Sequence, residues 1–467
     1  MNARKFARLG VPEGEAMRLA GTAVRDARAF GIAKRDIPGL IAAVVENPAD
    51  YLQDKLLGEL AAALMAREAE QPTFKPRKAP APFQIWGEDL DENSINQMKN
   101  AAQLPVSVRG ALMPDAHLGY GLPIGGVLAV RNAVIPYAVG VDIACRMKLS
   151  VLNLSPHTLR GEQKRLANAI ESETRFGIGA NFHKGERRDH PVMDEDWGVT
   201  AVTQRLRDKA WEQLGTSGSG NHFVEFGVLT ILNDELGLPE GEYLALLSHS
   251  GSRGAGATVA DFYSKLAMDL HPELPKELRH LAWLDLDSDA GREYWAAMQL
   301  MGHYAAANHA CIHQHVVKAL NTKVLLDIEN HHNFAWQEQH DGETVIVHRK
   351  GATPAGAGVL GIIPGSMGAP GFVVRGKGNE AALSSAAHGA GRRMSRKQAI
   401  KSFTWSEVKK FLRERDVTLL SAGLDEVPMA YKDIHEVMAA QVDLVEKMAR
   451  FDPKLVKMAP AGERPED

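Results

Sequence analysis

Cysteine is scarce in this chain, since only Cys145 and Cys311 occur among 467 residues. Two cysteines so far apart do not make the disulfide framework of a small secreted protein, which favours a reducing, cytoplasmic environment. Long apolar runs are missing too, because no stretch approaches the roughly 20 apolar residues that a membrane helix needs. The polar first ten residues also lack the features of a secretion signal. We therefore expect a soluble, cytoplasmic protein with no membrane partner.

A strong charge of either sign is also absent. The chain has 54 Lys and Arg residues against 58 Asp and Glu residues, which gives a formal charge of −4. This balance neither supports nor excludes RNA binding, but any RNA-binding surface has to be a local concentration of basic side chains. With 45% hydrophobic and 24% charged residues, the chain is long enough for one large core and one further unit.

Residues 1–82 have the pattern of a small helical accessory unit with a connector. Residues 13–33 and 50–68 show helical periodicity, and Asp50 is the expected N-cap of the second helix. A semi-rigid, extended connector follows because the chain then contains Pro72, Pro76, Pro80 and Pro82. We therefore predict a domain boundary near residue 82 and a catalytic body at 83–467.

Beyond this boundary the sequence changes to short runs rich in Val and Ile that end in Gly, Asn or His. These runs predict buried strands in GGVLAVRNAVIPYAVGVDI, NHFVEFGVL, YLALLSHSG, KVLLDIEN, ETVIVHRKGA, GVLGIIPG and FVVRGKG. Longer helical patterns fall at about 195–213, 257–269, 290–320 and 433–450. Together they predict the α+β class, with a mixed β-sheet catalytic body, surrounding helices and the small N-terminal helical unit.

Polar residues recur where the apolar runs of the body end, and a fold can hold such residues rigidly in a cleft. They are Asp115, His117, Asp142, Cys145, Asn221, His222, His249, His332, Asn333 and His388. Each one, taken singly, is more often a hydrogen-bonded core residue than a ligand. Their recurrence favours a metal site, because carboxylate, thiolate and imidazole ligands together suit borderline metals such as Mn, Co or Zn. A bridging carboxylate or thiolate could hold two ions.

Two other motifs lack a residue that their chemistry needs. His309 and His313 have the spacing of a zinc-protease helix, but Ala310 stands where that chemistry requires a general-base Glu. The segment GFVVRGKG resembles a phosphate-binding loop, but Gly378 replaces the Ser or Thr that would hold magnesium. We therefore disfavour a zinc-protease site and reject a Walker-type nucleotide site.

Positive charge is concentrated in two local clusters, although most such clusters are solvated surface. One contains Lys184, Arg187 and Arg188, and the other contains Arg392, Arg393, Arg396 and Lys397. The second cluster begins four residues after His388 in a Gly-rich turn, where backbone N–H groups and guanidinium groups could both meet phosphate. We therefore expect a phosphate site beside His388.

Nine segments of the body, taken together and in order, resemble the RtcB family of RNA ligases. They are PDAHLGYG, AVGVDIACRM, GSGNHF, HSGSRGAG, HHNFAW, RKGA, IIPGSMG, AAHGAGRRMSR and DEVPMAYKDIHEVMAAQ. The match runs from about residue 83 to Lys457, and nine collinear motifs are far more specific than one short motif. The helical N-terminal unit lies outside the match and receives no function from it.

The resemblance implies an RtcB-like fold and a GTP- and manganese-dependent RNA ligase. In such enzymes a histidine, His388 here, accepts GMP from GTP and passes it to an RNA 3′-phosphate derived from a 2′,3′-cyclic phosphate, and a 5′-hydroxyl then displaces GMP. Two Mn²⁺ ions would be held by Asp142, Cys145, His222, His249 and His332. The other catalytic residues would be Asp115, His117, Arg253, Lys350, Arg392 and Arg396. The nucleotide pocket would contain Asn221, His222, Phe223, Val224, Glu225, His332, Asn333, Pro364, Gly365, Ser366, Met367, His388, Gly389, Ala390, Gly391, Tyr431 and Lys457.

Three residues depart from the usual family pattern. Ala144 and Arg146 flank Cys145 in place of the small residues that are usual there, and Gly371 stands where Ser is usual. Arg146 could contact an RNA phosphate or point away from it. Gly371 removes a hydroxyl group that could contact the nucleotide.

Two other functions could use the same residues. A metal-dependent phosphoesterase could act on RNA or cyclic phosphate ends without joining them, but it does not need a guanylated His388. An RNA-binding protein that has lost catalysis is disfavoured, because the ligands and His388 are all present. The expected partners are GTP and RNA with 3′-phosphate or 2′,3′-cyclic phosphate and 5′-hydroxyl ends, in tRNA splicing or RNA repair. We expect a monomer; an activating protein partner and the natural RNA stay open.

Overall fold

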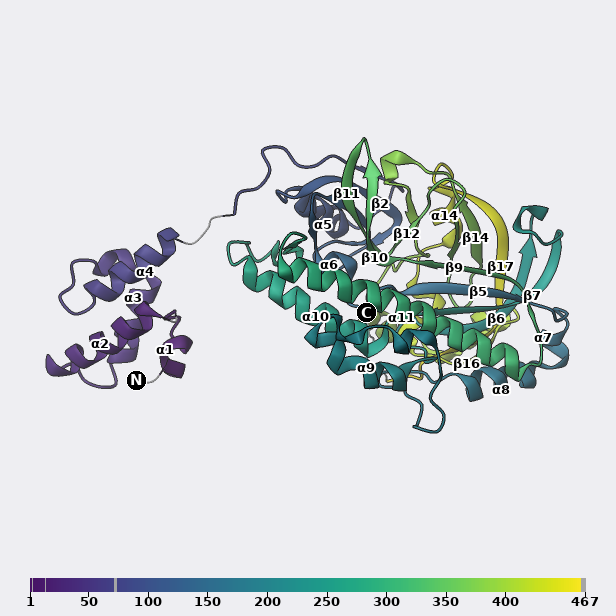
Figure 1. Cartoon of the computed structure of the whole chain (residues 1–467), viewed down its shortest axis with the longest axis horizontal. Helices are drawn as coiled ribbons and strands as arrows, with labels where there is room; N and C mark the ends of the chain where they lie inside the picture. The colour runs from purple at the N-terminus through teal and green to yellow at the C-terminus, as the bar shows by residue number, and fades with distance from the viewer. Residues whose placement is uncertain (2, 13, 71–73, 463–467) are drawn as a thin grey trace. The chain divides into compact units, whose positions relative to one another are not determined.

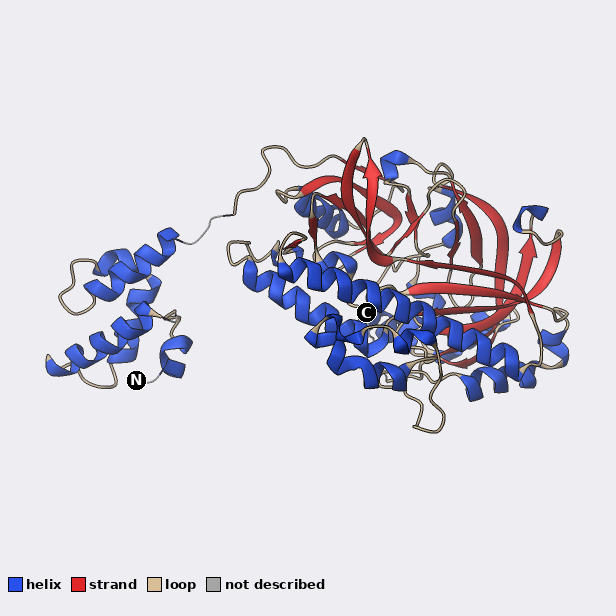
Figure 2. Cartoon of the chain, in the orientation of Figure 1, coloured by secondary structure: helices blue, strands red, loops and turns tan. Residues whose placement is uncertain are grey.

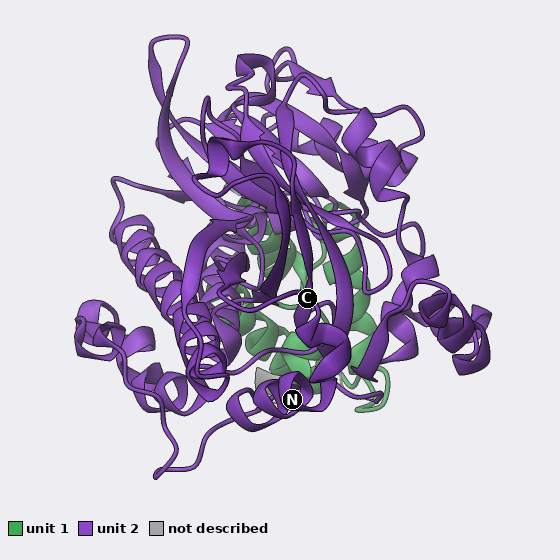
Figure 3. Ribbon diagram, turned by 90° about the vertical axis from the view of Figure 1, so that its right-hand side faces the viewer, with its two compact units in different colours: residues 1–74 green, residues 75–467 purple. Residues whose placement is uncertain are grey.

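The chain divides into two compact units, residues 1–74 and residues 75–467 (Figure 3). The computed structural model describes residues 1, 3–12, 14–70 and 74–462. Residue 13 of the first predicted helix and Pro72 of the predicted connector lie outside the described residues. Among the described residues, no helix is both long enough and apolar enough to cross a membrane.

The N-terminal unit is helical and has a core of its own. Its helices are α1 Ala3–Arg8, α2 Glu15–Ala29, α3 Ile37–Glu46 and α4 Gly58–Glu70 (Figure 1). Buried side chains from all four helices form one apolar cluster, among them Phe6, Leu19, Ile41 and Leu60. This unit therefore has the internal packing of a small separate fold.

Three features of this unit differ from the sequence predictions. Helices α1 and α3 were not predicted, although Pro38 of α3 lies in the first turn, where proline is tolerated. Asp50 is not the N-cap of a helix, since it lies in a 3-10 turn at Pro48–Tyr51. The Asp54 carboxylate instead accepts hydrogen bonds from the backbone N–H groups of Leu56 and Leu57, and α4 begins just after them.

The segment after the division packs against the larger unit. The backbone N–H of Arg77 donates to the carbonyl of Gln103, and that of Ala81 donates to the carbonyl of Ala102. These bonds join the proline-containing segment to the end of α5 Glu92–Ala102. The division between the units therefore lies before this segment rather than after it.

The larger unit is built on two large mixed sheets surrounded by helices, which confirms the α+β prediction (Figure 2). The five-stranded sheet has the order β1 Phe83–Ile85, β2 Ser107–His117, β3 Ile124–Val130, β11 Glu343–Lys350, β10 Asn333–His340. The eight-stranded sheet has the order β13 Leu360–Ile363, β14 Gly371–Gly376, β17 Val445–Met458, β6 Phe223–Ile231, β7 Gly241–Ser250, β5 Arg146–Leu152, β9 Val324–His331, with β16 Thr418–Ser421 beside β17. Two short pairs join β4 Ala133–Val134 to β8 Leu284–Asp285 and β12 Ala352–Pro354 to β15 Ser385–Ala387.

Strand β5 of the eight-stranded sheet is buried on both faces. In β5, Met147, Leu149 and Val151 pack into one apolar cluster, while Ser150 faces the other side and bonds to His313 of α11 Asp289–Ala319. Alternation with a period of two puts neighbouring residues of a strand on opposite faces. Figure 1 shows α11 running along β5 and β7.

Further helices complete the larger unit. They are α6 Pro136–Val139, α7 Thr158–Gly161, α8 Gln163–Glu173, α9 Ala201–Gln213, α10 Arg253–Leu270, α12 Arg396–Ser402, α13 Trp405–Arg413 and α14 Ile434–Ala439. Helices α9, α10 and α11 correspond to the patterns predicted at 195–213, 257–269 and 290–320. Their apolar periodicity spans several turns, which makes such helices the easiest to predict.

Two predicted elements are wrong in part. The helix predicted at 433–450 ends at Ala439, and β17 begins at Val445. Strand β17 pairs with β14 on one side and β6 on the other, so tertiary pairing overrides the helical preference of its Glu, Lys and Met residues. The strand-like run from 125 to 143 also breaks, because Pro136 opens the short helix α6.

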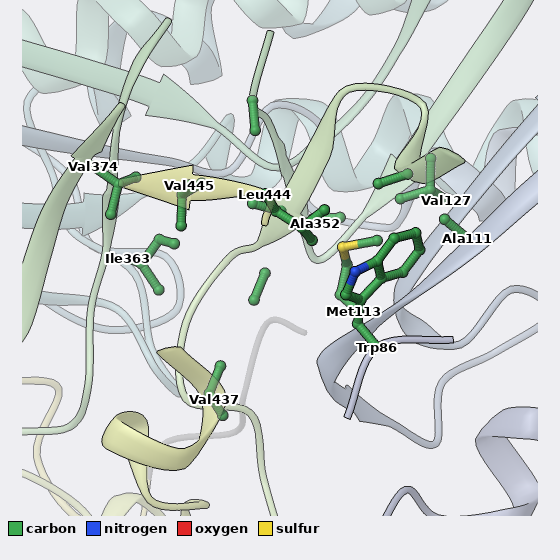
Figure 4. Close-up of a cluster of buried hydrophobic side chains, with 14 of the residues drawn as sticks. Trp86, Ala111, Met113, Val127, Ala352, Ile363, Val374, Val437, Leu444 and Val445 are labelled. Carbon is green, nitrogen blue, oxygen red and sulfur yellow. The ribbon is translucent and has the colours of Figure 1, made fainter. Parts of the chain in front are cut away.

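An apolar cluster supports the turn that contains His388. Figure 4 shows part of it, including Trp86, Met113 and Ile363. The same cluster includes Ala387 and Ala390, which flank His388 and are almost fully buried. Burial of these small residues fixes the backbone on both sides of His388.

Candidate active site

Neighbouring strands of the eight-stranded sheet bring four candidate metal ligands together. His249 lies in β7 opposite Phe223 of β6, and His222 directly precedes that residue. Strand β5 pairs with the other side of β7 and directly follows Cys145. Strand β9 lies beside β5 and ends just before His332. Sheet order alone therefore places these side chains at one end of the sheet.

The ligand atoms of this cluster lie at the spacing expected around metal ions. Cys145 Sγ is 3.0 Å from His249 Nε2 and 3.4 Å from His222 Nε2. His222 Nε2 is 3.0 Å from Asp142 Oδ2, and His249 Nε2 is 3.2 Å from His332 Nε2. Two atoms that bind one ion at roughly 2.0–2.3 Å lie roughly 3–3.7 Å apart. The cluster forms two groups, Cys145 with His249 and His332, and Cys145 with Asp142 and His222, so one thiol belongs to both.

The protonation of the buried imidazoles suits metal binding. Burial lowers the pKa of His249 to about 3, and burial also lowers the pKa of His332 well below its ordinary value. Both rings are therefore neutral at neutral pH, which is the form that binds a metal. His249 Nδ1 lies 3.0 Å from the carbonyl of Asn221, so the ring donates there and turns Nε2 toward the cluster. One carboxylate, one thiol and three imidazoles fit a borderline divalent metal.

Asp142 is held in place by a close approach of the backbone. Its Oδ1 accepts a hydrogen bond of 3.1 Å from the backbone N–H of Ser252. A methyl group added at Gly251 would lie 2.1 Å from the same oxygen. Only a residue without a side chain leaves room for the carboxylate, so this glycine is required by the geometry of the ligand.

Replacing Gly251 with alanine is expected to displace the Asp142 carboxylate. We expect Mn²⁺ affinity to fall by roughly tenfold to a hundredfold, the range found when partners of metal ligands are lost. Calorimetric titration of the metal-free protein measures this change. Gly185→Ala is the matched control, because no atom lies close to the side chain it would add. Equal Mn²⁺ affinity in the two variants would contradict the prediction.

The cluster opens into a cavity of about 950 Å³, a size that suits a nucleotide or another ligand of similar bulk. Most residues predicted for a nucleotide pocket line this cavity. They are Asn221, His222, Phe223, Glu225, His332, Asn333, Pro364, Gly365, Ser366, Met367, His388, Gly389, Ala390, Gly391 and Tyr431. The structure therefore brings together residues from β6, the β9–β10 junction and the turns after β13 and β15.

Four predicted site residues do not line this cavity, and one of them, Asp115, is fully buried behind His388. Val224 points into an apolar core, because the strand places it on the face opposite to its neighbours Phe223 and Glu225. The Lys457 amine lies outside the lining, 3.2 Å from Glu171 Oε1. Arg253 is almost fully buried and lines a second, smaller hollow of about 330 Å³.

His388 lies in the cavity and is oriented by Asp115. Asp115 Oδ2 is 2.7 Å from His388 Nδ1 and also accepts hydrogen bonds from the backbone N–H groups of His388 and Gly389. Asp115 is fully buried, whereas 14% of the His388 side chain is exposed. A carboxylate that accepts a hydrogen bond from the Nδ1–H group leaves the Nε2 lone pair of the ring able to act as a nucleophile or a base. The centre of the His388 ring lies 5.0 Å from the centre of the His332 ring, so His388 is next to a member of the candidate metal-ligand cluster.

Burial changes the acidity of three other groups in the cavity. It lowers the pKa of His117 to about 4 and that of Lys350 to about 7. The Lys350 amine can therefore hold or release a proton near neutral pH. Burial also raises the pKa of Glu225 well above its ordinary value, so this carboxyl can stay protonated and donate a hydrogen bond.

Arg392 and Arg396 line the cavity and share one buried carboxylate. Arg392 Nη1 is 3.1 Å from Glu426 Oε2, and Arg396 pairs with both Glu426 and Asp425. The Tyr431 hydroxyl donates to Glu426 as well. Glu426 therefore positions two arginines and a tyrosine at the cavity wall. Sequence reasoning missed it, because one acidic residue in DEVPMAYKD gives no sign of the cations it meets.

The three departures from the family pattern differ in their surroundings. Arg146 is buried and points away from the cavity lining, with Nη1 3.3 Å from Glu329 Oε1. Ala144 takes a left-handed backbone with φ 57°, and its N–H donates to the carbonyl of Asn333. A side chain at Gly371 would meet the backbone of Pro364, which itself lines the cavity.

The zinc-protease-like histidines and the first basic cluster both lie outside the candidate site. His309 Nδ1 and His313 Nε2 lie 2.7 and 2.8 Å from the hydroxyl of Ser248, behind β7. Neither histidine belongs to a ligand group among the residues that the structure describes. In the first basic cluster, Arg187 and Arg188 form ion pairs with glutamates, and neither lines the large cavity.

The fold and the site together define a class of protein. It is an α+β body in which a buried Asp, Cys and His cluster, suited to metal ions, lies beside a histidine oriented by a carboxylate. Comparison with known families agrees with this description, since the model of the RtcB family, described as tRNA-splicing ligase RtcB, matches residues 97–458. The chain belongs to the RtcB family.

Curated relatives match most of the chain. An RNA-splicing ligase RtcB of Escherichia coli is 36% identical over 395 residues, covering 78% of this chain and 94% of the relative. A tRNA-splicing ligase RtcB of Nanoarchaeum equitans is 32% identical over 460 residues, covering 82% of this chain and 96% of the relative. A tRNA-splicing ligase RtcB of Thermococcus kodakarensis is 29% identical over 468 residues, covering 82% of this chain and 96% of the relative. The resemblance seen in the sequence motifs is therefore confirmed.

Proposed function

We propose that this protein is an RNA ligase that joins 3′-phosphate or 2′,3′-cyclic phosphate ends to 5′-hydroxyl ends, using GTP and two Mn²⁺ ions. One observation carries the proposal: His388, oriented by Asp115, shares one cavity with a buried cluster of metal-ligand side chains. The relatives named RNA-splicing ligase RtcB support an RNA substrate. We propose that this activity joins RNA ends in tRNA splicing or in RNA repair.

The first step guanylates the protein. His388 Nε2 attacks the α-phosphorus of GTP, a nitrogen–phosphorus bond forms, and the bond to pyrophosphate breaks. Pyrophosphate leaves with the electron pair of that bond. Asp115 keeps the Nδ1 proton on the ring and stabilises the positive charge that develops there. A neutral imidazole is a competent nucleophile near neutral pH, which suits this step.

The next steps transfer GMP and join the ends. Water first opens a 2′,3′-cyclic phosphate to a 3′-phosphate, and an oxygen of this phosphate attacks the phosphorus held on His388. The nitrogen–phosphorus bond breaks, which regenerates the histidine and leaves a 3′-guanylate end. The 5′-hydroxyl then attacks the RNA phosphorus, GMP leaves, and a phosphodiester forms. The Lys350 amine, with a pKa of about 7, is suited to accept the hydroxyl proton.

Phosphate oxygens bear negative charge at every one of these steps. Arg392 and Arg396 line the cavity and offer N–H donors to them, in an orientation that Glu426 fixes. The five metal ligands named above would hold the two Mn²⁺ ions, with Cys145 in both groups. When bound, these ions supply positive charge that makes phosphorus more electrophilic. Such ligands bind Zn²⁺ more tightly than Mn²⁺, so use of Mn²⁺ would reflect availability and geometry.

A joining assay separates this function from hydrolysis. RNA with a 5′-hydroxyl and a 2′,3′-cyclic phosphate end is incubated with the protein, GTP and Mn²⁺. We expect longer or circular products that form only when GTP is present. A phosphoesterase would instead convert the cyclic phosphate to a monophosphate without GTP and without joined product. That result would overturn the proposal.

A further inference from the structure

The loop between β2 and β3 holds two large apolar side chains out in solvent. Leu118 is 55% exposed and Tyr120 is 67% exposed, and both line the cavity that contains His388. Neither residue has a role in the proposed chemistry. Exposed apolar side chains grouped at a cavity are a mark of ligand binding.

This exposure is not the result of a loosely held loop. The Gln97 side chain of α5 binds both backbone polar groups of Gly119: its Oε1 accepts from the N–H at 3.0 Å, and its Nε2 donates to the carbonyl. The buried Lys350 amine donates to the carbonyl of Tyr120. Gly121 has φ +71° and lies so close to His280 that a methyl group there would be 2.7 Å from its carbonyl oxygen. The loop is therefore pre-organised around its exposed side chains.

Aromatic rings support the exposed tyrosine. The His280 ring lies 5.8 Å from the Tyr120 ring, and the Tyr137 ring meets His280 edge-on at 4.7 Å. Tyr137 also lines the cavity. The Tyr120 ring is thus braced by protein and still two-thirds exposed, which is the arrangement of a surface on which another flat ring can stack.

Charge near this loop argues against a phosphate as its ligand. The segment before α5 contributes the exposed Asp89 and Asp91 to the same cavity lining, and α5 is the helix that holds the loop through Gln97. Carboxylates repel phosphate but do not oppose the uncharged face of a base. Most cationic groups of the lining lie elsewhere, in the turn that contains Arg393 and Lys397. The Lys350 and Lys432 amines lie near the loop, but both donate to backbone carbonyls. Phosphate recognition fits that turn, and base recognition fits the loop.

We propose that Tyr120, with Leu118 beside it, stacks on a base of single-stranded RNA next to the end that reacts at His388. This inference rests on the proposed function. Two side chains are far too small for a stable protein interface, which typically buries about 1,600 Å². A single aromatic ring is enough to stack one base, and this contact accepts any base because every base has a flat face.

Replacing Tyr120 with alanine tests whether this side chain is a stacking platform for an RNA base. We expect the KM for RNA in the joining assay to rise by about fivefold to a hundredfold, the range that stacking of one base on an aromatic ring implies. Tyr120→Trp should restore a KM close to the original, because a larger ring also stacks. Phe262→Ala is the matched control, since this exposed aromatic side chain lies outside the cavity lining. Labelling of the protein by GTP should be equal in all of these variants.

A direct binding experiment shows which RNA end carries the stacked base. It also distinguishes failure of this inference from failure of the proposed function. Two RNAs contain the fluorescent base 2-aminopurine, one in the 3′-terminal nucleotide and one in the 5′-terminal nucleotide, and stacking quenches the fluorescence. Quenching of one RNA by the original protein and by Tyr120→Trp, but not by Tyr120→Ala, would support the platform and identify the end. Equal quenching by all three proteins would show that RNA binds without stacking on Tyr120, which would overturn this inference. The exposed ring would then bind another partner, such as a protein. A fall in GTP labelling equal to the fall in joining would overturn it too, because the ring would then contact GTP. Absence of RNA binding by the original protein would overturn the proposed function as well.

Discussion

Replacing His388 with alanine is expected to abolish covalent guanylation of the protein and to lower RNA joining by at least about a thousandfold, as removal of a nucleophile does in other enzymes. The variant lacks the nitrogen that attacks GTP. It should still bind Mn²⁺, because His388 belongs to neither group of metal ligands. It should also seal RNA supplied with a 3′-guanylate end, since that substrate bypasses the histidine step.

Three measurements on this variant separate the roles of the histidines. They are protein labelling by GTP, metal content by mass spectrometry, and sealing of the 3′-guanylate RNA. His303→Ala is the matched control, because His303 is an exposed histidine outside the cavity lining. A covalent guanylate on His388→Ala, or failure to seal the 3′-guanylate end with full metal content, would contradict the assigned role.

Replacing Cys145 with alanine is expected to remove metal binding and every reaction step together. Cys145 is common to both candidate ligand groups, so its loss should weaken both at once. Loss of a partner of a metal ligand already costs about tenfold to a hundredfold in affinity, and loss of the ligand itself should exceed the upper value. Guanylation, joining and sealing of a 3′-guanylate end should all fall with the metal content.

Cys311→Ala provides a matched control for this variant. Cys311 is the other buried cysteine, and burial raises its pKa to about 12, so it stays a thiol and belongs to neither ligand group. Metal content and all activities should be unchanged in Cys311→Ala. Retention of two Mn²⁺ ions per chain in Cys145→Ala would show that Cys145 is not the shared ligand.

Much of the fold was predictable, because long helices and buried strands have strong periodicity. Helix α11 has buried apolar residues that recur over many turns, and strand β7 is a short run of Leu and Ala that ends at His249 and Ser250. Strand β17 was missed because Glu446, Lys447 and Met448 favour a helix when taken locally. The two neighbouring strands that decide its structure, β6 and β14, lie far away in the sequence.

The candidate site could be predicted at the level of residues but not of geometry. Polar residues at the ends of apolar runs predicted the candidate metal ligands and His388, and the structure brings them together because neighbouring strands of a sheet bring their ends together. Which side of a strand faces the cavity depends on register, and register places Val224 and Lys457 outside the lining. The space that Gly251 leaves for Asp142 and the pairing of Glu426 with two arginines are contacts between distant segments, so no local pattern shows them.

The central claim is that His388 is guanylated, and one experiment tests it directly. The protein is incubated with Mn²⁺ and GTP labelled at the α-phosphate, and the labelled peptide is identified by mass spectrometry. The account predicts a GMP adduct that is labile in acid, stable in alkali and located on His388. Absence of label with bound Mn²⁺, or an adduct located on another residue such as Lys350, would contradict it.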